Sequence, residues 1–166
     1  ESCVPLTKKY DNLLVVQTFS KSRSLAGARL GFGIGSAELI RDLNTIKFST
    51  NPYNINRMTM AAGVGALEDD AYRKANCAKI IENRAFTVAE LQKSGFTVLN
   101  SAANFIFARH PAIDGAALYQ TLKDNGILVR HFDKPALRQY NRVTIGTREQ
   151  METFIATVRR LWEDVL

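Results

Sequence analysis

The sequence predicts an α/β protein in two parts, and the distribution of strands along the chain carries this prediction. A short N-terminal part holds two predicted strands among helices, a long helical pattern follows, and after Gly95 the order becomes strand, strand, helix, strand, strand, helix. Two strands make a poor sheet by themselves, so we interpret the first part as the end of a larger α/β domain with an incomplete sheet. The second part predicts a small α+β domain whose helices cover a sheet. The predicted boundaries are residues 1–70 for the first part, 71–95 for an interdomain helix and 96–166 for the small domain.

The first part opens with an apolar run, Leu13-Leu14-Val15-Val16, that is typical of a strand buried on both faces in a helix-covered parallel sheet. Glycines in residues 29–35 suit close backbone approach in a second strand. Ser36 has the side chain of a helix N-cap. The predicted elements are strands at 13–16 and 29–35, helices from Ser36 to about Lys47 and from 55 to 67, and a turn-rich break at 48–54.

Apolar residues recur near every 3.6 positions from 71 to 93, which predicts one long helix. Asp69 and Asp70 can cap such a helix, and Gly95 has the conformational freedom to end it. Beyond Gly95 the predicted elements are strands at 96–99, 104–108, 127–129 and 142–145, a helix at 114–125 closed by Gly126, and an amphipathic helix at 148–165.

The composition excludes several classes of protein. Hydrophobic residues make up 46% of the 166 and charged residues 23%, which predicts a soluble, globular chain. No apolar run approaches the ~18 residues of a membrane span, and basic residues are scattered despite a net charge of +6, so we expect neither a membrane nor a nucleic-acid partner. Cys3 and Cys77 lack CxxC spacing and there are two histidines, so we expect no metal site, no disulfide framework and a cytoplasmic location.

The sharpest chemical signal is in residues 18–31, which read TFSKSRSLAGARLG and place a lysine just after a predicted strand. We expect Lys21 to be half-buried, with an amine that acts as a nucleophile toward an aldehyde. The hydroxyls of Thr18 and Ser20 can donate hydrogen bonds to a phosphate, and the Arg29 guanidinium can pair with it bidentately. A cofactor with both an aldehyde and a phosphate would use all these groups. The alternative is that Lys21 and Arg29 are ordinary solvated charges.

This segment resembles the cofactor-lysine motif of the fold-type-I, class I and II aminotransferases, and most of all that of the histidinol-phosphate aminotransferases. The resemblance implies the tail of the large pyridoxal-phosphate-binding domain followed by a C-terminal small domain. It implies that pyridoxal 5'-phosphate is held covalently by Lys21, with Ser20 and Arg29 on its phosphate and Thr18 assisting. It also implies that Lys21 moves the proton between the substrate and the cofactor.

Two further stretches, GILVR at 126–130 and NRVTIGTRE at 141–149, match strands whose arginines bind the substrate carboxylate or phosphate in that family. These substrate-binding roles fall on Arg130 and Arg142. Two guanidiniums on neighbouring strands could converge on one dianion. The alternative is that both arginines are surface ion-pair partners.

The NPYNIN stretch at 51–56 resembles a family segment whose tyrosine lies near the substrate pocket, which assigns Tyr53 to substrate binding. The alternative is a packed loop tyrosine with its hydroxyl in water. In the family, the aspartate, tyrosine and asparagine on the cofactor ring and a glycine-rich phosphate loop all precede the lysine motif, and this sequence contains none of them. Because the chain opens on Glu1, we expect it to be the C-terminal part of a longer protein.

The resemblance implies a homodimeric parent enzyme that exchanges an amino group between histidinol phosphate and 2-oxoglutarate. Within the same class, the runner-up is another family member, such as a threonine-phosphate decarboxylase or an aspartate or aromatic aminotransferase. The rival from another class is a folded fragment with no activity of its own.

Overall fold

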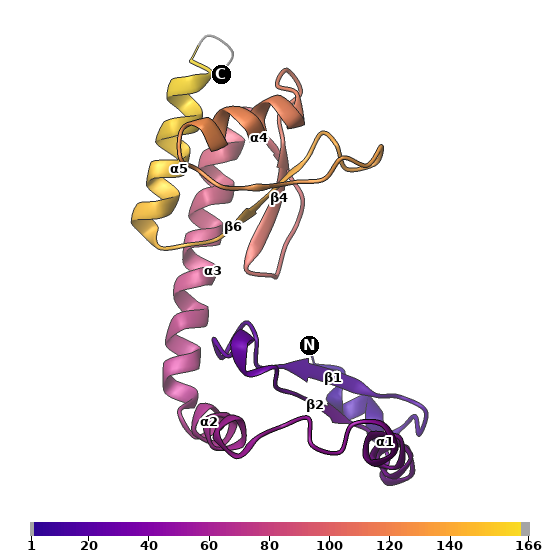
Figure 1. Ribbon diagram of the computed structural model, residues 1–166. Coiled ribbons are helices and arrows are strands. Elements are labelled where there is room, and N and C mark those ends of the chain that lie inside the picture. Colours follow the sequence, from indigo (N-terminus) through magenta and orange to yellow (C-terminus); the bar gives the residue numbers. More distant parts are fainter. Residues whose placement is uncertain (1, 164–166) are drawn as a thin grey trace. The chain divides into compact units, whose positions relative to one another are not determined.

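The protein, seen in a computed structural model that describes residues 2–163, divides into two compact units, one reaching to Lys74 and one starting at Ala75. A single long helix, α3 (Asp70–Lys93), runs through the division (Figure 1). The three-part assignment at 1–70, 71–95 and 96–166 stays a prediction. Within the described residues, no helix combines the length and apolar character that crossing a membrane requires.

The first unit contains a two-stranded antiparallel sheet in which β1 pairs with β2 from Val15 opposite Ile34 to Thr18 opposite Gly31. The sheet is narrow, and Gly31 lets its strands approach closely, because a Cβ there would lie 2.9 Å from the carbonyl oxygen of Gln17. The elements of this unit before α3 are the 3-10 helices η1 (Val4–Lys8) and η2 (Ala26–Ala28), the strands β1 (Val15–Thr18) and β2 (Gly31–Ile34), and the helices α1 (Ala37–Thr50) and α2 (Arg57–Glu68).

The interpretation of residues 13–16 as a parallel strand buried on both faces is wrong for this chain. The strand β1 begins at Val15, runs antiparallel to β2, and leaves Val16 70% exposed. The apolar run identified a strand correctly, but its burial depends on neighbouring elements, and no third strand of the described chain pairs with these two.

The second unit is a four-stranded antiparallel sheet of order β3-β4-β6-β5 with helices against it (Figure 1). This confirms the predicted succession of strands and helices after Gly95. The elements are β3 (Thr97–Val98), β4 (Phe105–Arg109), α4 (Gly115–Asp124), β5 (Arg130–His131), β6 (Asn141–Thr144) and α5 (Arg148–Leu161). The predicted end of the last helix, at residues 164–165, lies outside the described residues.

Successive side chains of the central strands β4 and β6 point alternately to the two faces of this sheet. Ile106 and Ala108 of β4 and Val143 of β6 are buried, whereas the side chains between them face the other way. The apolar stripe of α5 packs onto the same core through Met151, Phe154, Ile155 and Val158, joined by Leu91 of α3 and by Leu118 and Leu122 of α4. The three helices therefore cover one face of the sheet and leave the other without a helix.

Most helix ends confirm the signals in the sequence. Ser36 accepts a hydrogen bond from the amide of Leu39, and Asp114 accepts from two amides of α4. Gly95 and Gly126 both have φ +78° and follow α3 and α4 with the paired backbone hydrogen bonds of a Schellman ending. Thr147 and Gln150 form a capping box that was not foreseen.

The predicted strand at 127–129 is misplaced, because the strand that follows α4 is β5, Arg130–His131, at one edge of the sheet. Ile127 donates its amide to the carbonyl of Leu122, so the helix ending still holds the backbone there. Leu128 is 79% exposed and does not belong to the core.

We predict that truncating a core leucine of the second unit is costly, whereas truncating an exposed one is not. Leu122 is 1% exposed and Leu128 is 79% exposed, so the pair forms a matched comparison. Leu122→Ala is expected to lower the free energy of unfolding by about 2–5 kcal/mol, and Leu128→Ala to change it by no more than about 0.5 kcal/mol. Urea unfolding followed by the fluorescence of Trp162, the single tryptophan, which packs on this core, measures both. Equal losses would contradict the assigned core.

The second unit should also lose stability in mildly acidic solution because of His110. Burial lowers the pKa of this histidine below its usual 6.5, and its Nδ1 accepts a hydrogen bond from the amide of Ala112 at 3.2 Å. A depressed pKa means that the unfolded chain binds the proton more tightly, so this contribution is present above pH 6.5 and is lost as the pH falls through the folded pKa. Unfolding followed by Trp162 fluorescence is expected to show lower stability at pH 5.5 than at pH 7.5, which are about one unit below and above the pKa of an unfolded histidine. The difference should be smaller in His110→Gln.

Candidate functional site

The segment around Lys21 is a loop between β1 and β2 that is fastened at its base. Phe19, which is 4% exposed, donates its amide to the carbonyl of Leu30 and accepts from the amide of Leu25, both at 3.0 Å. Lys21 lies in a tight turn in which its carbonyl accepts from the amide of Ser24 at 3.0 Å. Its side chain is exposed in this chain, not half-buried as expected. The loop therefore presents an accessible amine on a fixed backbone.

The other residues predicted to bind the cofactor belong to the same loop or to the strand end before it. The Thr18 hydroxyl donates to the hydroxyl of Ser20 at 2.7 Å and accepts from the Ser20 amide at 3.0 Å. Arg29 donates from Nη1 to the carbonyl of Ala26 at 3.0 Å. In the described part of the chain, neither Lys21 nor Arg29 forms an ion pair with a carboxylate. The loop thus leaves the Ser20 hydroxyl, the Lys21 ammonium and part of the Arg29 guanidinium as donors for an anion.

Two residues of the loop adopt the left-handed backbone conformation although they are not glycine. Ser24 has φ 56° and Arg29 has φ 53°. This conformation costs a residue with a Cβ on the order of 1–2 kcal/mol, and such residues gather where a fixed geometry serves a function. At Arg29 it directs the guanidinium back toward the loop, where it bonds Ala26.

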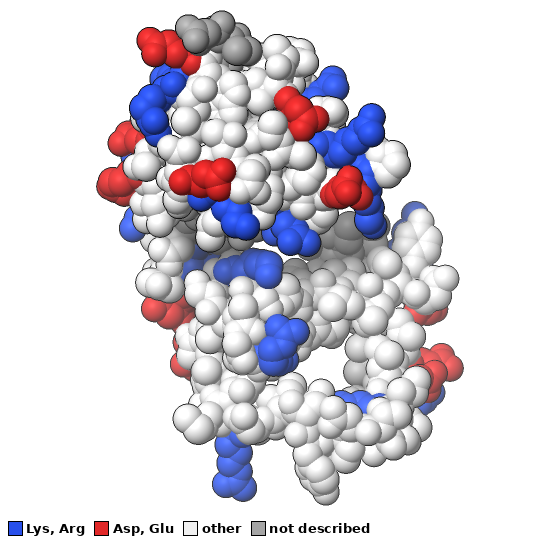
Figure 2. Space-filling view, turned by 45° about the horizontal axis from the view of Figure 1, so that its top comes forward, with Lys and Arg blue, Asp and Glu red and all other residues white. Residues whose placement is uncertain are grey.

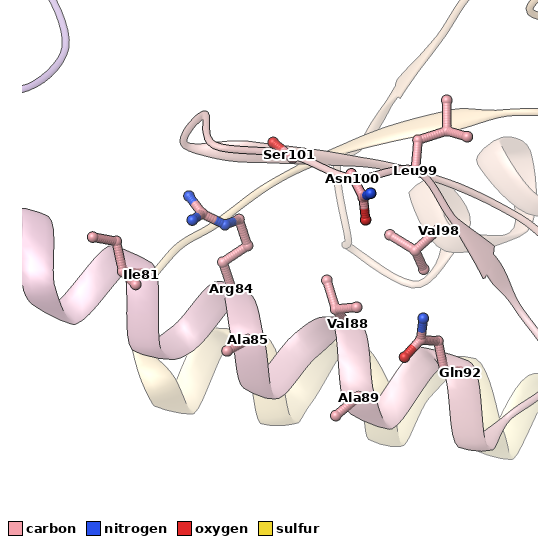
Figure 3. Close-up of a pocket in the computed structure, with 10 residues that line it drawn as sticks. All are labelled: Ile81, Arg84, Ala85, Val88, Ala89, Gln92, Val98, Leu99, Asn100 and Ser101. Carbon is pink, nitrogen blue, oxygen red and sulfur yellow. The ribbon is translucent and has the colours of Figure 1, made fainter. Parts of the chain in front are cut away.

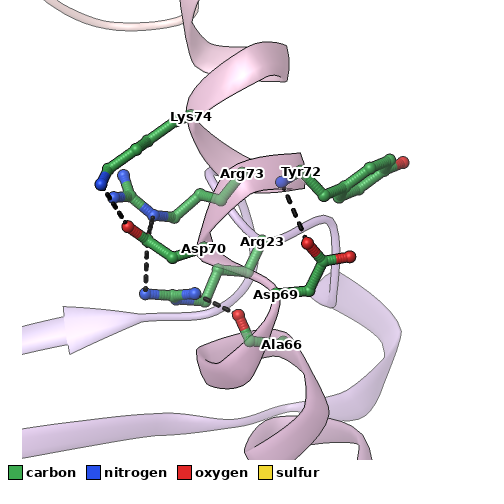
Figure 4. A network of polar contacts seen from close by, with 7 residues as sticks. All are labelled: Arg23, Ala66, Asp69, Asp70, Tyr72, Arg73 and Lys74. Carbon is green, nitrogen blue, oxygen red and sulfur yellow. Dashed lines mark hydrogen bonds and ion pairs between the residues drawn. The ribbon is translucent and has the colours of Figure 1, made fainter.

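Arg23 anchors the lysine loop to the helices of the same unit, a role that sequence reasoning missed (Figure 4). Its Nη1 donates to the carbonyl of Ala66 in the last turn of α2, and its Nη2 lies 4.0 Å from a carboxylate oxygen of Asp70. Its guanidinium also lies 5.7 Å from the centre of the Phe19 ring.

The carboxylate of Asp70 at the start of α3 collects three cations (Figure 4). Its hydrogen bonds with Arg73 and with Lys74 hold the pKa of Asp70 down, at about 2. Asp69 caps the helix instead, accepting from the amide of Tyr72 at 3.1 Å. Asp70 therefore stays ionised and ties Arg23 to the helix start.

Tyr53 lies between α1 and α2 and is 92% exposed. Among the described residues, its hydroxyl makes no hydrogen bond. No hydrogen bond or ring contact among the described residues links Tyr53 to the lysine loop, and the side chain is too exposed to be the packed loop tyrosine of the alternative.

Arg130 and Arg142, in the second unit, are direct partners on neighbouring strands. Residues opposite each other in an antiparallel pair point to the same face, so both side chains lie on the face that no helix covers. Like charges in this position repel each other. No carboxylate forms an ion pair with either arginine within the described residues, and the Nε of Arg142 is buried without a hydrogen-bond partner. The pair is therefore an unneutralised, partly desolvated double positive charge.

Aromatic rings take the place of carboxylates around this pair. The guanidinium of Arg142 lies 5.3 Å from the centre of the Phe105 ring and 5.9 Å from that of Phe132, and the guanidinium of Arg130 lies 5.3 Å from Phe132. Sequence reasoning missed both rings. The signal was present for Phe105, which alternates with the buried residues of β4, and for Phe132, which is two positions after Arg130 and so on the same side.

A separate pocket of about 380 Å³ lies in the second unit between α3 and residues 98–101 (Figure 3). Its lining is mostly aliphatic, and the side chains of Val88 and Val98 point toward each other across it. The one charged residue of the lining, Arg84, already donates to the carbonyl of Ala103 at 2.6 Å. None of the predicted site residues lines this pocket.

Positive charge is distributed over the surface. On the face in Figure 2, lysine and arginine side chains lie among wide uncharged areas, with acidic side chains interspersed. No group of three or more histidine, cysteine, aspartate or glutamate side chains suited to a metal ion occurs among the described residues. Cys3 and Cys77 are both free thiols.

Comparison with known proteins places these features in a family. Residues 1–158 match the family model of aminotransferases of class I and II. The histidinol-phosphate aminotransferase of Brachyspira hyodysenteriae is 53% identical over 159 residues, which are 96% of this chain and 45% of that protein. The chain thus spans about half the length of the curated relatives it matches.

Solved structures of histidinol-phosphate aminotransferases resemble this chain in fold. A histidinol-phosphate aminotransferase from Clostridium acetobutylicum matches with a TM-score of 0.88 and 27% identity, over 99% of this chain and 50% of that one. A histidinol-phosphate aminotransferase from Sinorhizobium meliloti, solved in complex with pyridoxal-5'-phosphate, matches with a TM-score of 0.80 and 26% identity, over 94% of this chain and 42% of that one. Both the sequence and the fold therefore show that this chain belongs to the class I and II aminotransferases.

Proposed function

We propose that this chain is the C-terminal part of a pyridoxal-phosphate-dependent aminotransferase that transfers the amino group of histidinol phosphate to 2-oxoglutarate. The observation that carries the choice of substrate is the Arg130–Arg142 pair, whose two charges have no carboxylate partner among the described residues. A phosphate monoester is a dianion and can neutralise two guanidiniums at once. Relatives that bear the name histidinol-phosphate aminotransferase support the same choice.

The lysine loop supports this proposal with groups suited to the aldehyde and the phosphate of pyridoxal 5'-phosphate. Lys21 offers an exposed amine for covalent attachment, and Arg29 offers a guanidinium. Because the Thr18 hydroxyl donates to Ser20, the hydroxyl hydrogen of Ser20 is left for a phosphate oxygen. The bound cofactor would supply an electron sink for the carbanion that forms when the substrate loses a proton.

Each residue then has a defined task in the parent enzyme. Lys21 holds the cofactor and afterwards carries the proton at its Nζ. Arg29 and Ser20 fix the cofactor phosphate, and Thr18 assists through its hydrogen bond to Ser20. The reacting end of the cofactor is thereby presented to Lys21. Arg130 and Arg142 bind the anionic end of the substrate, and Tyr53 borders the substrate pocket. The parent would be a cytoplasmic homodimer, and the rest of its length would supply the groups on the cofactor ring.

We predict that Lys21 is the lysine that captures the cofactor. Mixed with pyridoxal phosphate, the chain is expected to develop a yellow absorbance band that borohydride removes, with the reduced cofactor on Lys21 in a peptide map. Lys21→Ala should abolish the band, while Lys8→Ala, which removes another exposed lysine of the same unit, should retain it. An unchanged band in Lys21→Ala would show that attachment is non-specific.

The arginine pair should bind a phosphate dianion. Arg142→Gln is expected to weaken the binding of inorganic phosphate by about ten- to a hundredfold, because charge-assisted hydrogen bonds contribute roughly 1.5–3 kcal/mol. Arg160→Gln on α5 removes the same charge elsewhere in the unit and should leave the affinity unchanged. Isothermal titration calorimetry at low and high salt measures the effect, and equal losses in the two variants would refute a specific site.

A further inference from the structure

One aromatic ring contacts both members of the arginine pair. Phe132 follows β5 directly, and its ring centre lies 5.3 Å from the guanidinium carbon of Arg130 and 5.9 Å from that of Arg142. Phe105 contacts Arg142 only. Phe132 is thus the element that the two cations share.

The position of Phe132 is itself supported by other rings. Its centre lies 6.0 Å from that of Phe107, and Phe107 stacks on Tyr140 with centres 5.4 Å apart and an interplanar angle of 14°. Phe107 pairs with Arg142 across β4 and β6, so the row of rings is built on the paired central strands. Phe132 therefore has a backing that limits where its ring can go.

A ring shared by two arginines keeps them close together without a carboxylate, which matters in an anion site. Two arginines on adjacent strands repel each other, and a carboxylate that held them together would occupy the N–H groups that a ligand needs. The face of a ring attracts guanidinium groups through its quadrupole and uses none of those N–H groups. In agreement with this, the Nε of Arg142 is buried and has no acceptor among the described residues.

We propose that Phe132 is a positioning residue that holds Arg130 and Arg142 side by side so that both engage one oxyanion of the substrate. This inference rests on the substrate-binding role proposed for the two arginines. Phe132 contributes no hydrogen bond to the ligand; it sets the geometry in which the two guanidiniums meet it.

Three leucine substitutions on the same sheet face separate the roles of the rings. Phe132→Leu removes the ring that both arginines share, and Phe105→Leu removes a ring over Arg142 only. Phe107→Leu removes a ring that makes no cation–π contact with an arginine among the described residues. Phe132→Tyr keeps the aromatic face and serves as the rescue variant. Circular dichroism and thermal unfolding of each variant show which of them remain folded.

The first readout needs no ligand. The Nε–Hε resonances of Arg130 and Arg142, recorded by nuclear magnetic resonance and assigned by substitution, report the ring above each guanidinium. We expect both resonances to move in Phe132→Leu and only that of Arg142 to move in Phe105→Leu. In Phe107→Leu, which removes only the backing of Phe132, both should move less than in Phe132→Leu, and in Phe132→Tyr both should return. Unmoved resonances in folded Phe132→Leu would overturn the proposal.

The second readout is the affinity of the 166-residue chain for inorganic phosphate. Phe132→Leu is expected to weaken it about three- to tenfold, the size of a cation–π contact. Phe107→Leu should weaken it less, and Phe132→Tyr should restore it. If the original chain binds phosphate and Phe132→Leu binds it equally well, the positioning role is refuted while the arginine site stands. If the original chain binds no phosphate, the proposed substrate role fails, and the resonances alone decide whether the ring orders the pair.

Discussion

Alternation of side chains across the central strands β4 and β6 is the constraint from which the second unit follows. Because successive residues face opposite sides, Ile106 and Val143 build the helix-covered core while Phe107 and Arg142 are directed to the other side. A shift of one residue in the pairing would bury the arginine and expose the core. The hydrophobic core therefore fixes, at no additional cost, which side the arginine pair occupies.

In the first unit, the main constraint is the set of contacts that hold the loop between β1 and β2 in a strained conformation. Phe19 closes the loop through two backbone hydrogen bonds, and Gly63 of α2 makes room for this base, because a Cβ there would collide with Leu30. Arg23 adds a link to the end of α2 and to Asp70. These contacts supply the stability that non-glycine residues in the left-handed region, such as Arg29, require.

Much of the secondary structure could be predicted because its signals are local. Helix caps act on backbone groups within a few residues, so they can be predicted from the sequence, as at Ser36, Asp114, Gly95 and Gly126. The edge strand could not be placed as well. Ile127 and Val129 have the apolar character of a strand, yet the pairing begins only at Arg130, where β6 is in reach. Edge pairing depends on a partner that is distant in sequence.

The sequence by itself determined the family, the lysine motif and the two stretches that carry Arg130 and Arg142, because each is a run of residue types that can be identified without knowledge of the fold. Only the tertiary structure decided that Arg130 stands opposite Arg142, that Phe132 and Phe105 lie over the pair, and that Arg23 fastens the lysine loop. It also decided that β1 is antiparallel and open to solvent. These features depend on strand register and on contacts between segments far apart in the chain, and such contacts leave no periodic or local signal.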